Sequence, residues 1–179
     1  TKCRDAIVYC APGATVDVPY PPETSNYHHE IELVVAIGKE GSNISKDEAV
    51  SYIFGYAIGL DMTRRDLQSQ AKDKGRPWDN GKSFQYAAPM GEIVPIAKTG
   101  EIVDGRIALS VNGKIRQEAP MDEMITSVSE TIADLSRFHT LYPGDLIMTG
   151  TPAGVGAVVA GDILEGSAEK VGALRVKIV

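Results

Sequence analysis

The segment NYHHEIELVVAIG, residues 26–38, constrains the fold more than any other part of the chain. From Ile31 to Ile37 it is apolar at almost every position, which is typical of a strand covered on both faces. Glu30 and Glu32 stand at its beginning. Because side chains alternate across a strand, these two carboxylates point to the same face. The segment therefore predicts a central strand over residues 30–38, with two acidic groups that converge at its start.

Two carboxylates at a covered strand end need compensating positive charge. An ionised carboxylate in such a place costs several kcal/mol unless it is paired and hydrogen-bonded. For a single glutamate, a solvent-exposed strand end or pairing with a lysine or arginine would be the better interpretation. Two glutamates at i and i+2 favour a cation-binding site instead.

A third carboxylate follows in GYAIGLDMT, where Asp61 ends a second apolar run. With Glu30 and Glu32 it forms a candidate all-oxygen ligand set. Such a set favours a hard divalent ion, Mg²⁺ or Mn²⁺, which keeps waters that exchange with substrate oxygens. His28 and His29 adjoin the cluster and, as ligands, would favour zinc or iron. We interpret both as strand-end histidines in a hydrogen-bond network.

Composition limits the classes of function. The chain has 179 residues, 43% of them hydrophobic, which suits one domain over residues 1–179. Its net charge of -6 without a basic cluster argues against a nucleic-acid surface. No apolar run is long enough to span a membrane, and two cysteines are too few for a disulfide framework. We expect a soluble, cytoplasmic protein that binds small molecules; a mitochondrial location stays open.

Short elements separated by turns are predicted in the middle of the chain. Ser45 and Glu48 have capping-box spacing, which predicts a helix from about 46 to about 55. After a strand that ends at Asp61, RRDLQSQAKDKG predicts a polar helix closed by a glycine. The dipeptide Asn112-Gly113 between alternating runs predicts a two-residue hairpin.

The remaining elements indicate the fold class. One predicted helix face, formed by Met124, Val128, Ile132 and Leu135, has the spacing of a core contact. After it, short strands alternate with glycine turns. Strands outnumber the roughly three expected helices, so we predict an α+β fold that is mainly β, with mixed sheets.

DMTRRDLQ sets cationic and amide groups beside the third carboxylate. Gln68 follows Arg65 at i+3, so both side chains can share one helix face. Together they are suitable for holding a small carboxylate substrate. A solvated helix start, with Arg64 and Arg65 paired to Asp66, explains this stretch equally well.

Two glycine-containing loops do not match nucleotide motifs. Five residues separate Gly75 from Gly81, whereas the phosphate loop of nucleotide triphosphatases has four. Lys82 follows that second glycine and is either a partly buried lysine aimed at a ligand or an ordinary surface lysine. In MTGTPAGVG the glycine spacing is not that of a dinucleotide fingerprint, but the exposed N–H groups of such a loop can bind an anion.

Five stretches together resemble the fumarylacetoacetate hydrolase family. They stand in the order HHEIELVVAIG, GYAIGLDMTRRDLQ, KGRPWDNGKSF, LSVNGKIRQ and LYPGDLIMTGTPAGVG and span nearly the whole chain. The acylpyruvate and fumarylpyruvate hydrolase branch, whose members include oxaloacetate decarboxylases, is the most similar. The resemblance implies a β-sandwich roll, usually a homodimer, with Mg²⁺ or Mn²⁺ on Glu30, Glu32 and Asp61.

The resemblance also implies roles for residues around the metal. Arg65 and Gln68 would face the substrate, and Lys82 would contact its oxygens near the metal. The pocket would be closed by three consecutive residues, Gly150, Thr151 and Pro152. We assign no role to Arg64.

One family motif is not found in this sequence. Relatives of this branch carry Gly-x-Asn-Tyr-x-x-His-x-x-Glu on a mobile lid, and its His and Glu act as an acid–base pair. None of the three histidines, His28, His29 and His139, matches it. We expect either that an upstream segment carries this lid or that the chain is a degenerate member.

These observations predict a metal-dependent hydrolase that cleaves a carbon–carbon bond in a 2,4-dioxo acid. The metal would stabilise the enolate left when the bond breaks, with Lys82 and Gln68 available to the oxyanion. Oxaloacetate decarboxylation needs the same enolate and stays open. A 2-oxo acid isomerase or hydratase is a further alternative, and a non-catalytic binding module is the least favoured.

Overall fold

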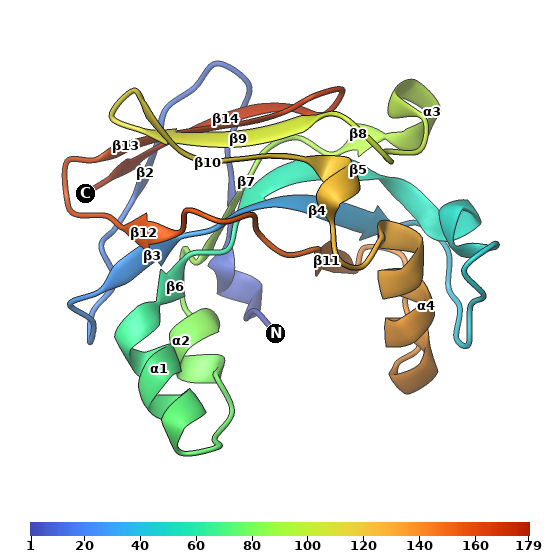
Figure 1. Ribbon diagram of the computed structural model, residues 1–179, viewed down its shortest axis with the longest axis horizontal. Coiled ribbons are helices and arrows are strands. Elements are labelled where there is room, and N and C mark those ends of the chain that lie inside the picture. The colour runs from blue at the N-terminus through green and yellow to red at the C-terminus, as the bar shows by residue number, and fades with distance from the viewer.

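The computed structural model describes residues 1–179 and consists mainly of two facing β sheets (Figure 1). The larger sheet has the order β1-β7-β5-β4-β11, with β8 beside β5. Its strands are β1 (Ile7–Tyr9), β4 (Ile31–Ile37), β5 (Ile53–Leu60), β7 (Ala88–Met90), β8 (Val94–Pro95) and β11 (Leu146–Met148).

The second sheet has five strands in the order β10-β9-β13-β14-β2. They are β2 (Val16–Val18), β9 (Arg106–Val111), β10 (Lys114–Pro120), β13 (Ile163–Ala168) and β14 (Gly172–Ile178). A small third sheet joins β12 (Gly156–Ala157), β3 (Tyr27–His29) and β6 (Thr63–Arg64). The pairs β1–β7 and β14–β2 are parallel and the others antiparallel, so the predicted mainly β architecture with mixed sheets is confirmed.

Strand β4 is buried along its whole length, as its sequence predicts. Ile31, Leu33 and Val35 belong to the core between the two large sheets. The alternate residues, including Glu32 and Val34, therefore face the opposite side of the sheet. This alternation directs the acidic side chains away from the hydrophobic core.

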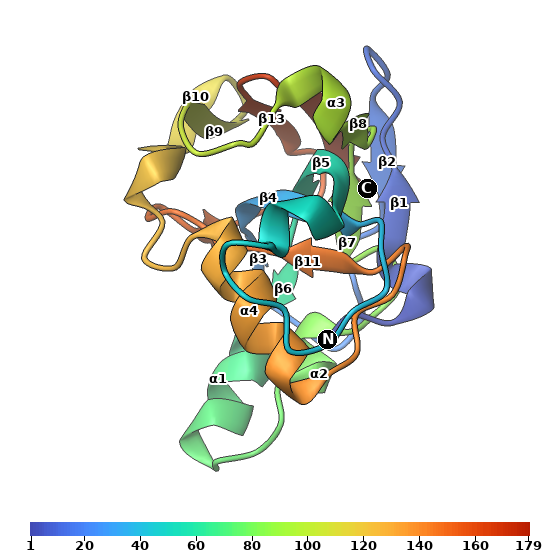
Figure 2. The same ribbon diagram turned by 90° about the vertical axis from the view of Figure 1, so that its right-hand side faces the viewer.

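Helices lie mainly on that opposite side (Figure 1). They are α1 (Arg65–Asp73), α2 (Asp79–Lys82), α3 (Ile96–Thr99) and α4 (Val128–Phe138), with short 3₁₀ turns η1 (Arg4–Ala6), η2 (Ala49–Tyr52) and η3 (Met121–Glu123). Figure 1 shows α1 and α2 at one end of the sheet and α4 at the other, with the N-terminus between them, and Figure 2, viewed from the α4 end, shows these helices on the same side of the sheet. No helix combines the length and the apolar character needed to cross a bilayer.

The predicted helix over 46–55 is wrong. Only η2 forms there, because β5 already begins at Ile53 and pairs with β4. A side chain on Gly55 would come within 2.3 Å of the Val94 carbonyl oxygen, so this position suits close strand packing. Ser45 donates to the Glu48 carboxylate at 2.7 Å, but no helix follows.

The other element predictions are confirmed with small changes. Helix α1 covers the predicted polar segment, and the hairpin β9–β10 turns at Asn112 and Gly113, both with positive φ. Of the predicted helix face, Val128 and Ile132 are buried in α4. Met124 lies before that helix but still packs against the core, as does Leu135. There are four α-helices rather than about three, and two of them are single turns.

Candidate metal and substrate site

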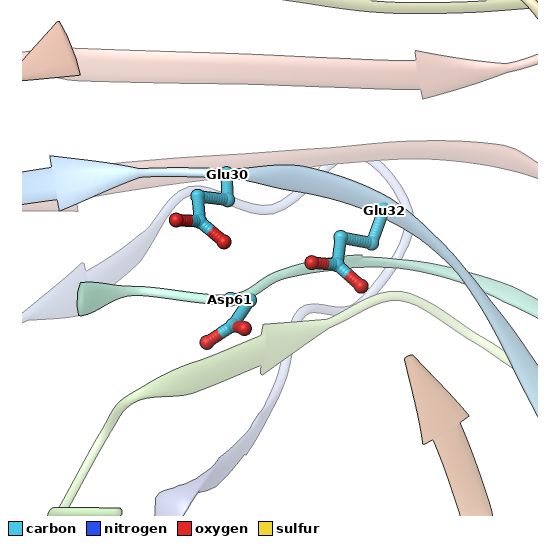
Figure 3. Close-up of side chains that lie close together, drawn as sticks. All are labelled: Glu30, Glu32 and Asp61. Atoms are coloured by element: carbon cyan, nitrogen blue, oxygen red, sulfur yellow. The ribbon is translucent and has the colours of Figure 1, made fainter. Parts of the chain in front are cut away.

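The antiparallel register of β4 and β5 brings the three predicted carboxylates together. Glu32 pairs with Gly59, and the Asp61 N–H donates to the Glu30 carbonyl at 2.8 Å. One oxygen from each of the three carboxylates lies within 4.8 Å of the others. Figure 3 shows them converging below the sheet. The acidic cluster thus follows from strand pairing.

Burial and mutual repulsion act on the acidic cluster. Glu30 is 7% exposed and Glu32 is 3% exposed. Burial raises the pKa of Glu32 to about 7, and the neighbouring Asp61 carboxylate contributes to the rise. A hydrogen bond of 2.8 Å from the Gly150 N–H to Glu32 Oε2 opposes it. Three carboxylates this close and this buried form a site that requires positive charge.

Predicted substrate-facing residues supply part of that charge. Lys82 Nζ lies 2.8 Å from Glu30 Oε2 and 2.7 Å from Asp61 Oδ2. Arg65 pairs with Glu30 and also donates to Gln68 Oε1. The lysine side chain is 15% exposed, so the surface-lysine interpretation is wrong.

Lys2 is a further site residue, which no motif in the sequence predicts. Its ammonium lies 2.5 Å from Asp61 Oδ1 and donates to the carbonyls of Met62 at 3.2 Å and Lys82 at 2.7 Å. Burial lowers the pKa of Lys2, and the Asp61 carboxylate opposes this shift. No motif in the sequence identified this lysine, because its partners lie about sixty to eighty residues further along the chain.

The residues present fit a hard divalent ion. The donors are carboxylate oxygens only, without cysteine, and the cluster is buried. Asp61 Oδ1 is buried and accepts no well-directed hydrogen bond, since its contact with Lys2 is an ion pair only. Displacement of the Lys2 ammonium would free this oxygen for a ligand bond. The cluster can bind Mg²⁺ or Mn²⁺.

The two neighbouring histidines belong to hydrogen-bond networks, as the sequence predicts. His29 is 1% exposed, and its Nδ1 lies 2.8 Å from Gln117 Oε1. His28 Nε2 lies 2.8 Å from Asn26 Oδ1, and Arg65 Nε donates to His28 Nδ1 at 3.4 Å. Burial lowers the pKa of both histidines. Neither lies within the group of possible metal ligands.

The loop after β11 is attached to the acidic strand. Besides the Gly150 contact with Glu32, the Thr151 hydroxyl donates to the Ile31 carbonyl at 2.7 Å. Pro152 accepts a hydrogen bond from Gln117 through its carbonyl. Of the three predicted pocket residues, Gly150 thus contacts the cluster directly, while Thr151 and Pro152 contact its neighbours Ile31 and Gln117.

An open cleft of about 800 Å³ adjoins the acidic cluster. Asp61 and Lys82 line it, together with the N-terminal residues 1–4 and with Leu135 of α4. Val34, Gly59, Pro89 and Met148 contribute apolar surface from the sheet. His139, at the end of α4, lines this cleft and not the acidic cluster. The site can therefore accept a small molecule with a polar end at the carboxylates and an apolar middle.

Arg64 and Asp66 lie outside the acidic cluster. The Arg64 guanidinium stacks over the Phe84 ring, 4.3 Å from its centroid. Asp66 accepts from the Thr24 hydroxyl at 2.6 Å and from the Ser25 N–H at 3.0 Å. The alternative in which Asp66 pairs with the two arginines is therefore wrong.

Comparison with known proteins agrees with this geometry. The family described as fumarylacetoacetate (FAA) hydrolase C-terminal matches residues 3–179. The chain belongs to the fumarylacetoacetate hydrolase family. It is 55% identical over 167 residues to a fumarylpyruvate hydrolase of Ralstonia sp, covering 93% of this chain and 85% of that protein.

Two further relatives are an oxaloacetate tautomerase and a second fumarylpyruvate hydrolase. The mitochondrial oxaloacetate tautomerase of Rattus norvegicus is 40% identical over 175 residues, which cover 98% of this chain and 78% of that protein. The crystal structure of fumarylpyruvate hydrolase from Pseudomonas aeruginosa, in complex with Mn²⁺ and pyruvate, superposes with a TM-score of 0.98. It is 48% identical, and the match covers 99% of this chain and 76% of that one.

Proposed function

We propose that the chain is a metal-dependent hydrolase that cleaves a carbon–carbon bond in 2,4-dioxo acids of the acylpyruvate or fumarylpyruvate type. The observation that carries this proposal is the cluster of Glu30, Glu32 and Asp61, the first two buried and the third lining an open cleft. The relative that binds Mn²⁺ and pyruvate supports it, because pyruvate is the enolate-derived product of such a cleavage.

Glu30, Glu32 and Asp61 would hold Mg²⁺ or Mn²⁺. The ion, when bound, supplies a Lewis acid that favours negative charge developing on the 2-oxo acid end of the substrate. The protein's own charges around this site balance one another. Three carboxylates face three cations, Lys2, Arg65 and Lys82, so a divalent ion adds two positive charges that an anionic substrate can neutralise.

Lys82 and Gln68 are the proposed catalytic residues. The Lys82 ammonium lies between two of the carboxylates and can rotate toward a substrate oxygen, where it would stabilise an oxyanion. Gln68 is held by Arg65, and its amide N–H groups stay available as donors. Arg65 and the loop Gly150–Pro152 are the proposed substrate contacts.

The acid–base step needs groups outside this cluster. His28 and His29 are engaged in the network described above, and His139 lies in the cleft wall. We propose that residues 1–179 form one catalytic domain and that a preceding segment carries the lid with the His and Glu pair of its relatives. A water activated by that pair would attack the distal carbonyl. Closure of the lid would exclude bulk solvent, which favours the reaction.

The remaining proposals concern partners and location. The substrate is a small dioxo acid, and we propose a homodimer in the cytoplasm. The net charge of -6 gives no support for a nucleic-acid partner.

A tautomerase is the second candidate function. The rat relative, 40% identical over nearly the whole chain, favours it. Tautomerisation of oxaloacetate uses the same enolate without breaking a carbon–carbon bond, so the acidic cluster and Lys82 would serve both reactions.

Product analysis tests these two functions. The protein, with any segment that precedes residue 1 in its full chain, is incubated with Mn²⁺ and fumarylpyruvate or acetylpyruvate, and in parallel with enol oxaloacetate. Release of pyruvate and the second acid identifies the hydrolase. Loss of the enol absorbance of oxaloacetate with no cleavage of either dioxo acid would overturn the hydrolase proposal in favour of the tautomerase.

A further inference from the structure

Gln117 is a buried polar residue with four hydrogen bonds that reach three parts of the chain. Its Nε2 donates to Thr151 Oγ1 at 2.7 Å and to the Pro152 carbonyl at 2.9 Å. Its Oε1 accepts from the Ile31 N–H at 3.1 Å and lies 2.8 Å from His29 Nδ1. One side chain of β10 thus joins the start of β4 to the loop after β11.

The orientation of this amide is set by the backbone. The Pro152 carbonyl can only accept and the Ile31 N–H can only donate, so Nε2 must face the former and Oε1 the latter. His29 must then donate from Nδ1. Only this orientation of the Gln117 amide allows all four hydrogen bonds to form.

A β-bulge turns Gln117 inward. Ile115 pairs with Ser110 and Gln117 pairs with the next residue, Leu109, so Arg116 is the extra residue. In a regular strand, residues 115 and 117 would point to the same face. Here Ile115 is 57% exposed while Gln117 is 1% exposed. The apolar side chain lies outside and the amide inside, the reverse of what burial alone favours.

The same bulge contacts the glycine-rich loop. Gly154 has φ +101, and a Cβ there would lie 1.9 Å from the Arg116 carbonyl oxygen. Only glycine fits this approach. The loop therefore packs against the bulge at Gly154, and its residues Thr151 and Pro152 bond to Gln117.

The loop also contacts the acidic strand. Gly150 bonds to the Glu32 carboxylate and Thr151 bonds to the Ile31 carbonyl. These contacts and those of Gln117 attach the loop both to β4 and to β10. Gln117 itself does not line the cleft and is not one of the possible metal ligands.

We propose that Gln117 is a positioning residue, which fixes the substrate-facing loop Gly150–Pro152 relative to the carboxylates. The inference rests on the proposed function, because that function makes the loop a substrate contact. If Gln117 has this role, the β10 bulge affects how tightly the site binds substrate. It does not affect how tightly the site binds the metal ion.

Calorimetry on three variants tests this. Gln117→Glu keeps the acceptor oxygen for His29 and Ile31 but removes the donor to the loop. Gln117→Leu removes all four bonds without adding charge. Thr151→Val removes one partner in the loop, and Gln70→Glu on the exposed side of α1 is the control for added charge. For each protein, Mn²⁺ is titrated first, and oxalate is then titrated into the Mn²⁺-loaded protein.

The expected result is a split between the two ligands. Mn²⁺ affinity should stay within about twofold, because the bonds of the carboxylates persist, while oxalate affinity should fall roughly five- to tenfold, the scale of a lost hydrogen bond. Combining Gln117→Glu with Thr151→Val should lose less than the product of the two single losses, because both variants break the bond between Gln117 and Thr151. Gln70→Glu should match wild type.

Three results would overturn the inference. Unchanged oxalate affinity in Gln117→Glu is one, and multiplicative losses in the double variant are another. If Gln117→Leu does not fold, Gln117→Glu still decides, since it preserves the buried N–H partners. A wild-type chain that does not bind Mn²⁺ would overturn the proposed function itself, and this inference with it.

Discussion

Lys2 Nζ lies 2.5 Å from Asp61 Oδ1, so the N-terminal segment is joined directly to the carboxylate at the end of β5. The lysine side chain is 16% exposed and the aspartate side chain 14%. Breaking a pair this buried leaves an uncompensated charge, which is costly. A bound divalent ion would supply the positive charge that Lys2 supplies without it.

Lys2→Met should therefore destabilise the metal-free protein more than the Mn²⁺-loaded protein. We expect Tm to fall by roughly 5–10 °C without metal, as a loss of a few kcal/mol implies for a chain of this size, and by less than half of that with saturating Mn²⁺. Differential scanning calorimetry measures both. Lys98→Met, on the exposed side of α3, is the control. Equal losses with and without Mn²⁺ would contradict the prediction.

Glu32→Ala should abolish Mg²⁺ and Mn²⁺ binding while the fold persists. It removes one of three predicted ligands and one of three neighbouring buried negative charges, so repulsion within the metal-free cluster falls. Calorimetry should detect no Mn²⁺ binding, and circular dichroism should match wild type. Metal affinity like that of wild type would refute the site.

Lys82→Ala should act on turnover more than on metal affinity. Loss of one oxyanion donor costs roughly a hundredfold or more in kcat. Steady-state pyruvate release, measured on the most active form of the enzyme, gives this value. The same variant should still bind Mn²⁺, since the three carboxylates remain. Kinetics equal to those of wild type would exclude a catalytic role for the lysine.

Residues in regular strands were predictable from sequence, and residues whose place depends on long-range contacts were not. Alternation along β4 predicted that Glu30 and Glu32 converge, and strand pairing then fixed Asp61 beside them. The family resemblance supplied the expected roles of Arg65 and Gln68, and the structure joins these two by a hydrogen bond.

Gln117 and Lys2 show where the sequence carried no local signal. Period-two alternation sets Gln117 on the same face as Ile115, and only the bulge reverses this. The position of Lys2 depends on the end of β5 and on α2, both distant in sequence. The false helix at 46–55 has a related cause: its capping pattern is local, but pairing with β4 decides the conformation.

Gly154→Ala tests the contact between the loop and the β10 bulge. The added methyl group would lie 1.9 Å from the Arg116 carbonyl oxygen and would also require φ +101 of an alanine, so the loop must move. We expect oxalate affinity to fall at least as far as in Gln117→Glu, while Mn²⁺ affinity stays within about twofold. Gly13→Ala is the matched control, since that glycine also has positive φ but no atom near its Cβ. Equal ligand affinity in both variants would contradict a positional role for this contact.

Glu130 should make stability depend on pH in the acid range. Its hydrogen bond from Lys46 and those from Ser127 lower the pKa of Glu130 from its ordinary 4.5 to about 2. A carboxylate with a lowered pKa in the folded state stabilises it above the unfolded pKa, and this contribution is lost as pH falls from about 4.5 to about 2.

The matching experiment compares Tm of wild type and Glu130→Gln between pH 7 and pH 2, with Glu101→Gln as the control for one lost surface charge. The side chains of Lys46 and Glu130 are 58% and 44% exposed, so salt screens the pair and the effect is a few degrees at most. The difference in Tm between wild type and Glu130→Gln should be constant above about pH 5 and should shrink below about pH 4.5, because protonation removes from wild type what the substitution has already removed. Since the same carboxylate closes the capping box of α4, helix content should follow the same curve. A difference in Tm that does not change with pH would mean that the charge of Glu130 contributes nothing and that only its hydrogen-bonding shape matters.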